Sequence, residues 1–480
     1  MKIIDDLLNG ITMYRLLFYV LIFLVGVAVT LSFFKFLPFD PVNLILSAAF
    51  LTLVCWATNT IFAKVFKVPA NFESVYITAL ILTLILTPIR SIHDLILFFW
   101  VAVLSQSAKY ILAINKKHLF NPAAFAVVLT AIVLNFSASW WVGTAWMAPF
   151  VVVTGILIVR KIRRVDLVFS FLFTALVLIL GVSILKGNDL ISVAQKLILD
   201  TPILFFSFVM LTEPLTTPPS KVKQILYGGL IGVGFWQIAP EIALLVGNIF
   251  SYIVSPKGKL LLKLKEKDKI APDIYEFVFD VDKKFNFLPG QYMEWTLSNK
   301  PDSRGNRRYF TIASAPTEKN LHIGVKFYPD SSNFKRTLIF LSPGDEIIAG
   351  QLSGDFILPE DSTKKLVFIA GGIGITPYRS MIKYLQDISQ KRDIILLYSS
   401  KKESDFVYKD ILNYVKTIYV ATEKGQYIDE TMIKKQIPDF KDRIFYISGP
   451  HSMVDAFEKT LKEMGVSGQQ LKVDFFPGYA

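Results

Sequence analysis

The sequence predicts a membrane α-helical bundle of about ten spans, followed by an antiparallel β-barrel and an α/β doubly wound domain. Three observations support this fold class. Nearly all long apolar runs of this 480-residue chain lie before about residue 255, and hydrophobic residues make up 53% of it. Short strands with a period of two follow that point. Strands then alternate with helices. We expect domain limits at residues 1–256, 257–360 and 361–480.

Each expected span is an apolar run, and about 20 such residues cross a bilayer. Two spans, Ser74–Thr87 and Thr201–Leu211, are short. A count of nine is the alternative, in which the last two spans form one helix kinked at Pro240. The ten expected spans are Tyr14–Phe36, Pro41–Ala63, Ser74–Thr87, His93–Ile114, Phe120–Phe136, Thr144–Val159, Asp166–Leu185, Thr201–Leu211, Val222–Ile238 and Pro240–Val254.

Basic residues predict the orientation of these spans. The net charge is +12, and the Lys and Arg residues of the first half cluster in loops that a ten-span chain places inside. This topology puts both termini in the cytoplasm and the chain in the inner membrane of a bacterial cell. It also explains the positive charge without nucleic-acid binding. No small-residue cleavage site follows the first apolar run, so we expect that span to be retained.

Ten spans divide into five and five, which predicts two halves of opposite orientation, an inverted repeat. The short spans are third in each half, and both run into proline, at Thr87-Pro88 and within Thr212–Pro219. Paired interrupted spans indicate a central binding site; re-entrant hairpins that only pack the bundle are the alternative. The expected acceptor-site residues are Asn121, Thr212, Glu213 and Thr217. Glu213 either belongs to this site or lies solvated in a loop.

Three segments, His118–Leu129, Trp140–Trp146 and Phe205–Pro219, carry a resemblance to a membrane family. They resemble the NqrB/RnfD family, the membrane subunits of the sodium-pumping NADH:quinone reductase and the Rnf complex, over about residues 10–254. The resemblance implies a flavin and electron transfer across the membrane. Many members carry FMN on the threonine of a Ser-Gly-Ala-Thr type motif. This sequence lacks that tetrapeptide, so the flavin implied here is a non-covalent FMN or riboflavin.

Cysteine and histidine are scarce in this chain. It has one cysteine, Cys55, and four histidines. An iron–sulfur cluster takes several cysteine ligands. A haem held by two histidines needs both of them at the same depth in the membrane. The topology places His93 and His118 at opposite faces of the membrane. The sequence therefore predicts no iron–sulfur cluster, no haem and no metal site.

The second half changes pattern twice. Alternating strands from Lys259 predict a small antiparallel barrel over about Lys257–Pro359. From Lys365 the alternation of strand and helix predicts a doubly wound parallel sheet. Glycines 371, 372 and 374 follow its first strand, and Gly449-Pro450 follows a later one. Backbone approaches a phosphate closely at such glycines, so both turns predict a nucleotide cleft at the carboxyl ends of the strands.

Four motifs in order carry a second resemblance, to the ferredoxin–NADP reductase family over about Lys257–Ala480. They are Arg307–Ser314, Ser331–Leu338, Ala370–Pro377 and Ser448–Val454. In the family, the first motif supplies an arginine for the FAD pyrophosphate, an aromatic ring on the isoalloxazine and a hydroxyl near its N5. The second motif holds the FAD diphosphate, and the third and fourth hold the nicotinamide nucleotide. Phe310 replaces the usual tyrosine, and Ser448 stands where members often have cysteine.

The resemblance implies Thr311 and Ser448 as catalytic residues. Of the terminal aromatics, the resemblance implies that Phe475, Phe476 or Tyr479 covers the flavin; core packing of the last strand is the alternative, and the choice among the three stays open. Ser399, Ser400, Lys401 and Lys402 favour a nucleotide with a 2′-phosphate. The cofactor-binding residues implied are Arg308, Tyr309, Phe310, Thr311, Ser314, Ser332, Asn333, Phe334, Lys335, Gly371, Gly372, Gly374, Thr376, Ser399, Gly449, Pro450 and Phe476.

Together the two halves predict a membrane-bound, NAD(P)H-dependent flavoprotein oxidoreductase. Electrons are expected to pass from cytoplasmic NAD(P)H through FAD to a flavin or quinone in the membrane domain, and from there to further electron-transfer proteins. Three alternatives stay open: a redox-driven Na⁺ or H⁺ transporter, a haem-free quinone or ferric reductase, and a non-catalytic subunit that anchors a reductase.

Overall fold

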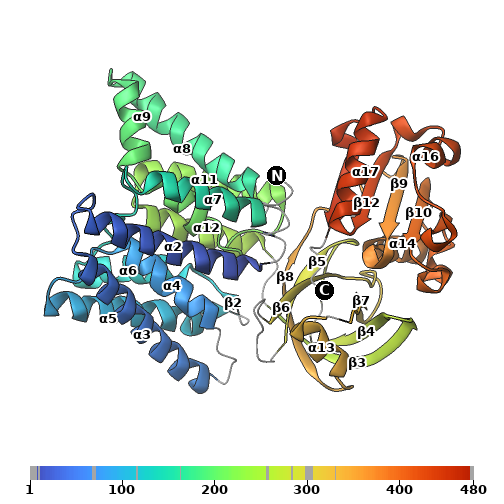
Figure 1. The fold of residues 1–480 in the computed structure, drawn as a ribbon, viewed down its shortest axis with the longest axis horizontal. Coiled ribbons are helices and arrows are strands. Elements are labelled where there is room, and N and C mark those ends of the chain that lie inside the picture. The colour runs from blue at the N-terminus through green and yellow to red at the C-terminus, as the bar shows by residue number, and fades with distance from the viewer. Residues whose placement is uncertain are drawn as a thin grey trace. The chain divides into compact units, whose positions relative to one another are not determined.

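The computed structural model describes Leu8 and residues 11–66, 72–114, 117–162, 164–255, 259–282, 285–297, 306–329 and 331–475. The chain forms two compact units, Met1–Gly258 and Lys259–Ala480. The first unit is mainly helical, and the second combines two β-sheets with helices (Figure 1). The three domain limits expected from the sequence stay predictions.

The helices of the first unit begin where the sequence supplies caps. Asp40 accepts hydrogen bonds from the backbone of Val42 and Asn43 ahead of α3, and Ser91 with Asp94 forms a capping box on α5. A short hairpin of β1 (Ala113–Ile114) and β2 (Lys117–His118) precedes α6. The helices are α2 (Met13–Phe33), α3 (Pro41–Val65), α4 (Phe72–Ile85), α5 (Ile92–Ile111), α6 (Pro122–Leu134), α7 (Ala148–Ile162), α8 (Val165–Leu185), α9 (Leu190–Leu199), α10 (Ile203–Phe205), the π-helix η1 (Phe206–Met210), α11 (Lys221–Gln237) and α12 (Pro240–Val254).

Four of these helices, α2, α3, α5 and α8, are long and apolar enough to cross a membrane. The pair Leu190–Leu199 and Ile203–Met210, bent by 60°, would be a fifth span if counted as one. Each of the ten expected spans overlaps a helix, but helix length and composition do not confirm ten crossings. α11 and α12 are separate helices, and α9 lies where no span is expected, begun by the cap of Asp189.

One packing pattern occurs twice in the first unit. In the first set, α2 packs on α4, α3 packs on α4 and α5, and α5 packs on α6. In the second set, α7 packs on α10 and η1, α8 packs on η1 and α11, and α11 packs on α12. The sets also meet through equivalent members, because α2 packs on α7 and α6 on α12. Helix α4 and the π-helix η1 therefore hold the same place in their sets.

The first sheet of the second unit has six antiparallel strands in the order β6-β5-β8-β3-β4-β7. The Ala313 N–H, just beyond β6, donates to the His322 carbonyl of β7 at 2.8 Å, so the two edge strands meet and the sheet closes as a barrel. Trp295, Phe277, Phe279 and Phe334 fill its core. The elements are β3 (Leu260–Ala271), β4 (Ile274–Val281), β5 (Tyr292–Thr296), β6 (Arg307–Thr311), β7 (Leu321–Lys326), α13 (Asn333–Phe340) and β8 (Glu346–Ser353).

The second sheet has five parallel strands in the order β11-β10-β9-β12-β13. Every residue of β9 is buried, as expected for a strand covered on both faces. The chain returns from β11 to β12 beside β9, and ligands of such sheets bind where the strand order reverses. The elements are β9 (Leu366–Gly371), α14 (Thr376–Asp387), β10 (Ile394–Ser400), α15 (Lys409–Leu412), β11 (Lys416–Ala421), α16 (Glu430–Gln436), β12 (Ile444–Gly449), α17 (His451–Glu463) and β13 (Leu471–Phe475).

Candidate functional site

The two glycine turns of the second unit meet at one edge of the parallel sheet. β9 ends at Gly371 and its neighbour β12 ends at Gly449, whose added Cβ would lie 3.2 Å from the Gly371 Cα. A Cβ on Gly374 would lie 2.4 Å from the Ser448 carbonyl oxygen. Gly372 has a φ of +54°, and a Cβ there would meet no atom within 4 Å. The strand ends thus form an edge lined by backbone atoms. Residues with a side chain at Gly374 or Gly449 would fill the space beside it.

Ser448 is the buried hydroxyl of this edge. It is fully buried on β12, and its Oγ has no hydrogen-bond partner among the described residues. Asp474 of the neighbouring strand β13 is in register with Ser448 and is also buried. Sequence reasoning did not assign Asp474 to the site. A buried hydroxyl without a partner is rare, so a ligand group is the natural partner for Ser448.

The remaining nucleotide residues lie around the same edge. Thr376 begins α14 and donates its hydroxyl to the Ile373 carbonyl at 3.2 Å. Ser399 of β10 is in register with Gly371. Pro450 precedes the first residue of α17, so two helices begin here and can direct N–H groups at phosphate. Phe476 lies outside the described residues.

Strand β6 supplies the flavin motif. The Arg308 guanidinium lies 5.4 Å from the centre of the Phe334 ring, and the Phe310 ring lies 5.9 Å from the same ring. Thr311 is buried, and its Oγ1 has no hydrogen-bond partner among the described residues. The Tyr309 hydroxyl donates to Glu294 at 3.1 Å. Arg308 and Thr311 therefore fit a bound FAD, since one supplies a buried cation and the other an unused hydroxyl.

The start of α13 lies beside that strand. Ser332 caps the helix, with its hydroxyl accepting from the Lys335 N–H at 3.5 Å. The Phe334 side chain is fully buried in the barrel core, so only its backbone is free to approach a ligand. Lys335 donates its ammonium to the Lys326 carbonyl at 2.9 Å, and Asn333 is exposed. Of this motif, the helix N-terminus is the part suited to a diphosphate.

Ser314 lies between the barrel and α14, where the two parts of the second unit are joined. Its carbonyl accepts from the Ser380 hydroxyl at 2.6 Å, and its own hydroxyl accepts from the His322 N–H at 3.1 Å. Arg379, 5% exposed, donates to the Ala313 carbonyl at 3.0 Å and to both carboxylate oxygens of Glu318. Both hydrogen-bonding groups of Ser314 are used in this junction.

A second acid, Glu276, lies beside Arg379. Burial alone would raise the pKa of the Glu276 carboxyl, but the hydrogen bond and charge of His322 and the charge of Arg379 outweigh it and lower the pKa. His322 Nδ1 lies 3.4 Å from the Glu276 carboxylate. The junction is therefore a buried, paired network, which stabilises one arrangement of barrel and nucleotide domain.

Removing Arg379 is expected to weaken this junction. Arg379→Met leaves the Glu318 and Glu276 carboxylates without their cation, and breaking a buried pair costs about 3 kcal/mol. Hydrogen exchange of β7 and α14 in the full chain would measure the loss. Lys383→Met, which breaks an i,i+4 pair with Asp387 on the same helix, is the matched control, with an expected loss of about 0.5 kcal/mol. Equal losses in both variants would contradict the role given to Arg379.

In the first unit, two of the four expected acceptor-site residues come together. The Asn121 amide donates to Glu213 at 2.9 Å, and the Asn121 backbone N–H donates to Asn248 at 2.8 Å. His118 Nε2 lies 3.4 Å from the other Glu213 oxygen, and the Thr216 hydroxyl donates to Glu213 at 3.0 Å. Glu213 thus lies in a polar cluster that joins segments 92 residues apart.

The other two acceptor-site threonines bond the local backbone. Thr212 donates to the Phe208 carbonyl at 2.8 Å, and Thr217 donates to the Glu213 carbonyl at 3.0 Å. Sequence reasoning did not assign His118, Thr216 or Asn248 to this cluster. Asn248, a polar residue inside an expected span, was the one usable signal among them. In the described part of the chain, no group of three His, Cys, Asp or Glu side chains could hold a metal ion.

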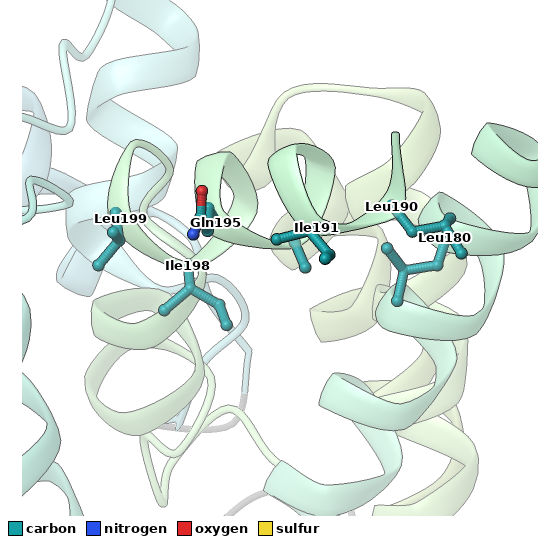
Figure 2. Close-up of a pocket in the computed structure, with 7 residues that line it drawn as sticks. Leu180, Leu190, Ile191, Gln195, Ile198 and Leu199 are labelled. Atoms are coloured by element: carbon teal, nitrogen blue, oxygen red, sulfur yellow. The ribbon is translucent and has the colours of Figure 1, made fainter. Parts of the chain in front are cut away.

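An open apolar pocket of about 470 Å³ lies between α8 and α9 (Figure 2). Gln195 supplies its polar side chain. The other lining residues are aliphatic: Leu180, Leu190, Ile191, Ala194, Ile198 and Leu199. No residue of the polar cluster around Glu213 lines this pocket.

Comparison with known proteins identifies part of the second unit. Residues 368–459 match the family model described as the oxidoreductase NAD-binding domain. A flavohemoprotein of Oceanobacillus iheyensis is 25% identical over 238 residues, covering 45% of this chain and 58% of that protein. The glycine betaine monooxygenase reductase subunit of Chromohalobacter salexigens is 25% identical over 213 residues, covering 40% and 57%. The chain thus spans less than two thirds of these relatives.

Two solved structures show a likeness to part of this chain. Ferredoxin-NADP⁺ reductase from Plasmodium falciparum with 2′P-AMP is 22% identical, with a TM-score of 0.40, covering 46% of this chain and 97% of that one. The ferredoxin reductase of carbazole 1,9a-dioxygenase is 19% identical, with a TM-score of 0.41, covering 46% and 69%. The family match confirms an oxidoreductase module that uses a nicotinamide nucleotide, and its relatives are flavin-dependent reductases. The NqrB/RnfD resemblance of the first half stays a prediction.

Proposed function

We propose that this chain is a membrane-bound NAD(P)H-dependent flavoprotein oxidoreductase that passes electrons from cytoplasmic NAD(P)H through FAD to a flavin or quinone in the first unit. The proposal rests on two buried hydroxyls of the second unit, on Thr311 and Ser448, that have no hydrogen-bond partner among the residues the structure describes. Each lies on one of the four motifs that resemble reductase sites, and each can bond a ligand. When bound, FAD supplies the exchange between a two-electron donor and one-electron acceptors.

The residues of the second unit would bind and orient the two ligands. Arg308 and the N-terminus of α13 would hold the FAD diphosphate, and the Thr311 hydroxyl would bond the flavin ring. Gly371, Gly374 and Gly449 leave room for the nucleotide backbone to lie against the sheet edge. The Ser448 hydroxyl would hold the nicotinamide amide. The junction of Arg379 with Glu318 would keep these two sites at a fixed spacing.

The membrane part of the proposal is a ten-span bundle with an inverted repeat. The repeated packing of the helices and the pairing of α2 with α7 and α6 with α12 support it. The π-helix η1 supports an acceptor site near Glu213, because π-turns often mark functional positions. The hydrogen bonds of Asn121 and Thr216 to Glu213, with the His118 ring nearby, would hold the carboxylate beside the acceptor and let it exchange a proton there.

A substitution at Glu213 tests this part separately from the reductase module. Glu213→Gln keeps the shape but removes the acid, so we expect quinone reduction by NAD(P)H to fall about tenfold or more. Reduction of ferricyanide, which takes electrons from the second unit directly, should stay unchanged. The measurement is the ratio of the two activities in the full chain reconstituted in liposomes.

Glu241→Gln is the matched control for this experiment. Glu241 is a buried carboxylate of the first unit and accepts from the Trp140 indole at 3.1 Å, but among the described residues no hydrogen bond or ion pair joins it to the Glu213 cluster. The acceptor proposal fails if both variants lose quinone reduction equally. It also fails if the extracted chain holds one FAD and no second flavin or quinone.

A further inference from the structure

The Lys109 ammonium, near the end of α5, is bound by neutral oxygens. Its Nζ lies 3.0 Å from the Ser74 carbonyl oxygen, 3.1 Å from the Ser74 hydroxyl, 3.0 Å from the Thr78 hydroxyl and 2.9 Å from the Gln106 amide oxygen. Within the described part of the chain, no carboxylate oxygen lies within 4.0 Å of it. An ammonium has three hydrogen atoms to donate, so four oxygens satisfy it fully.

This arrangement differs from that of an ordinary lysine at a helix end. Such a side chain extends along apolar surface until its charge reaches water. Lys109 instead directs its charge across to the first turns of α4. A charge inside an apolar helix bundle is costly and commonly marks a functional position. Here the charge is offset by dipoles of oxygen atoms and not by an ion pair.

The second helix set contains a corresponding group of three packed elements. α3, α4 and α5 pack together in the first set as α8, η1 and α11 do in the second. In the second set phenyl rings fill the contact: Phe206 lies 5.3 Å from Phe171 and 5.4 Å from Phe235. In the first set, by contrast, the oxygens of Ser74, Thr78 and Gln106 surround a charge.

Several neutral oxygens around one positive charge are the ligand set of a monovalent cation. Carbonyl, hydroxyl and amide oxygens replace the hydration shell of such an ion, and backbone oxygens of helices inside membrane proteins often do so. We propose that Ser74, Thr78 and Gln106 form a monovalent-cation site between α4 and α5, which the Lys109 ammonium occupies as a tethered cation. The protein then needs no free Na⁺ or K⁺ at this place.

The test removes the tethered cation and offers a free one. Lys109→Ala in the full chain should melt at a lower temperature than the wild type in choline chloride. Potassium, sodium or ammonium chloride at equal ionic strength should raise its melting temperature by about 3 °C or more, because an ion that binds only the folded state stabilises it. The wild type should change by less than about 1 °C on the same scale.

Three variants distinguish a site from a general salt effect. Lys64→Ala removes an exposed lysine in the last turn of α3 and should show no cation response. Lys109→Met fills the space without charge and should show none either. Lys109→Ala combined with Thr78→Val removes one ligand oxygen and should lose the response.

Two results would overturn the proposal. One is a melting temperature of Lys109→Ala that is equal in all four salts. The other is failure of Lys109→Ala to fold at any potassium concentration while Lys109→Met folds. Because the measured quantity is stability and not electron transfer, the outcome is independent of the function proposed above.

Discussion

Alanine at Gly374 is expected to lower kcat/KM for NAD(P)H about 100-fold or more while FAD stays bound. The added Cβ would lie 2.4 Å from the Ser448 carbonyl oxygen and 2.8 Å from the Gly449 Cα. Both are backbone atoms of the neighbouring strand end, so neither can rotate away. The turn after β9 must shift, and displacement of a bound reactant by about 1 Å costs about 100-fold in rate.

A glycine elsewhere in the second unit provides the matched control. A Cβ on Gly468 would meet nothing within 4 Å, so Gly468→Ala should keep wild-type activity. The measurement is steady-state oxidation of NAD(P)H with ferricyanide, together with the flavin absorbance of the purified chain. Full activity of Gly374→Ala would show that the nucleotide does not lie at this edge.

Alanine at Arg308 is expected to give a chain that loses FAD on purification. Arg308 is 5% exposed, and Phe334, the second residue of α13, lies beneath its guanidinium. The contact with Phe334 places the Arg308 guanidinium near the N-terminus of α13, which is suited to bind the FAD diphosphate. A charge-assisted hydrogen bond contributes about 1.5–3 kcal/mol, so loss of a bidentate contact should weaken FAD binding about 100-fold or more.

Two further variants separate charge from geometry in this prediction. Arg308→Lys keeps the charge but loses the planar fork, so an intermediate loss of about tenfold is expected. Lys319→Ala removes an exposed lysine in the turn after β6 and should bind FAD normally. FAD per chain and the dissociation constant from flavin fluorescence are the measured quantities. A full FAD complement in Arg308→Ala would contradict the assignment.

Local patterns of the sequence determined much of the fold. Alternation of strand and helix predicted the parallel sheet, and the glycine turns after its strands predicted the shared edge of Gly371 and Gly449. These inferences hold because parallel strands place their carboxyl ends together whatever else packs around them. Caps such as Asp40 and Ser91 likewise mark helix starts through bonds to residues only two or three positions away.

Crossings of the membrane are less well determined by sequence alone. Apolar runs located the helices, but α4, α6 and α12 are short and α9 with the Ile203–Met210 pair is bent. The length of an apolar run does not show where the helix within it breaks, because such breaks depend on prolines and on packing against neighbouring helices.

Only the tertiary structure decided which polar side chains are used up and which stay available. Ser314 and Phe334 belong to motifs, yet one is bonded at the junction with α14 and the other fills the barrel core. Asn121 meets Glu213, and Lys109 meets Ser74, over long separations in sequence. Helical and strand periodicity state which face of an element is apolar, but they do not state which distant element covers it. That pairing comes from packing, and it distinguishes the hydroxyls of Thr311 and Ser448 from the many serines and threonines whose bonds are already made.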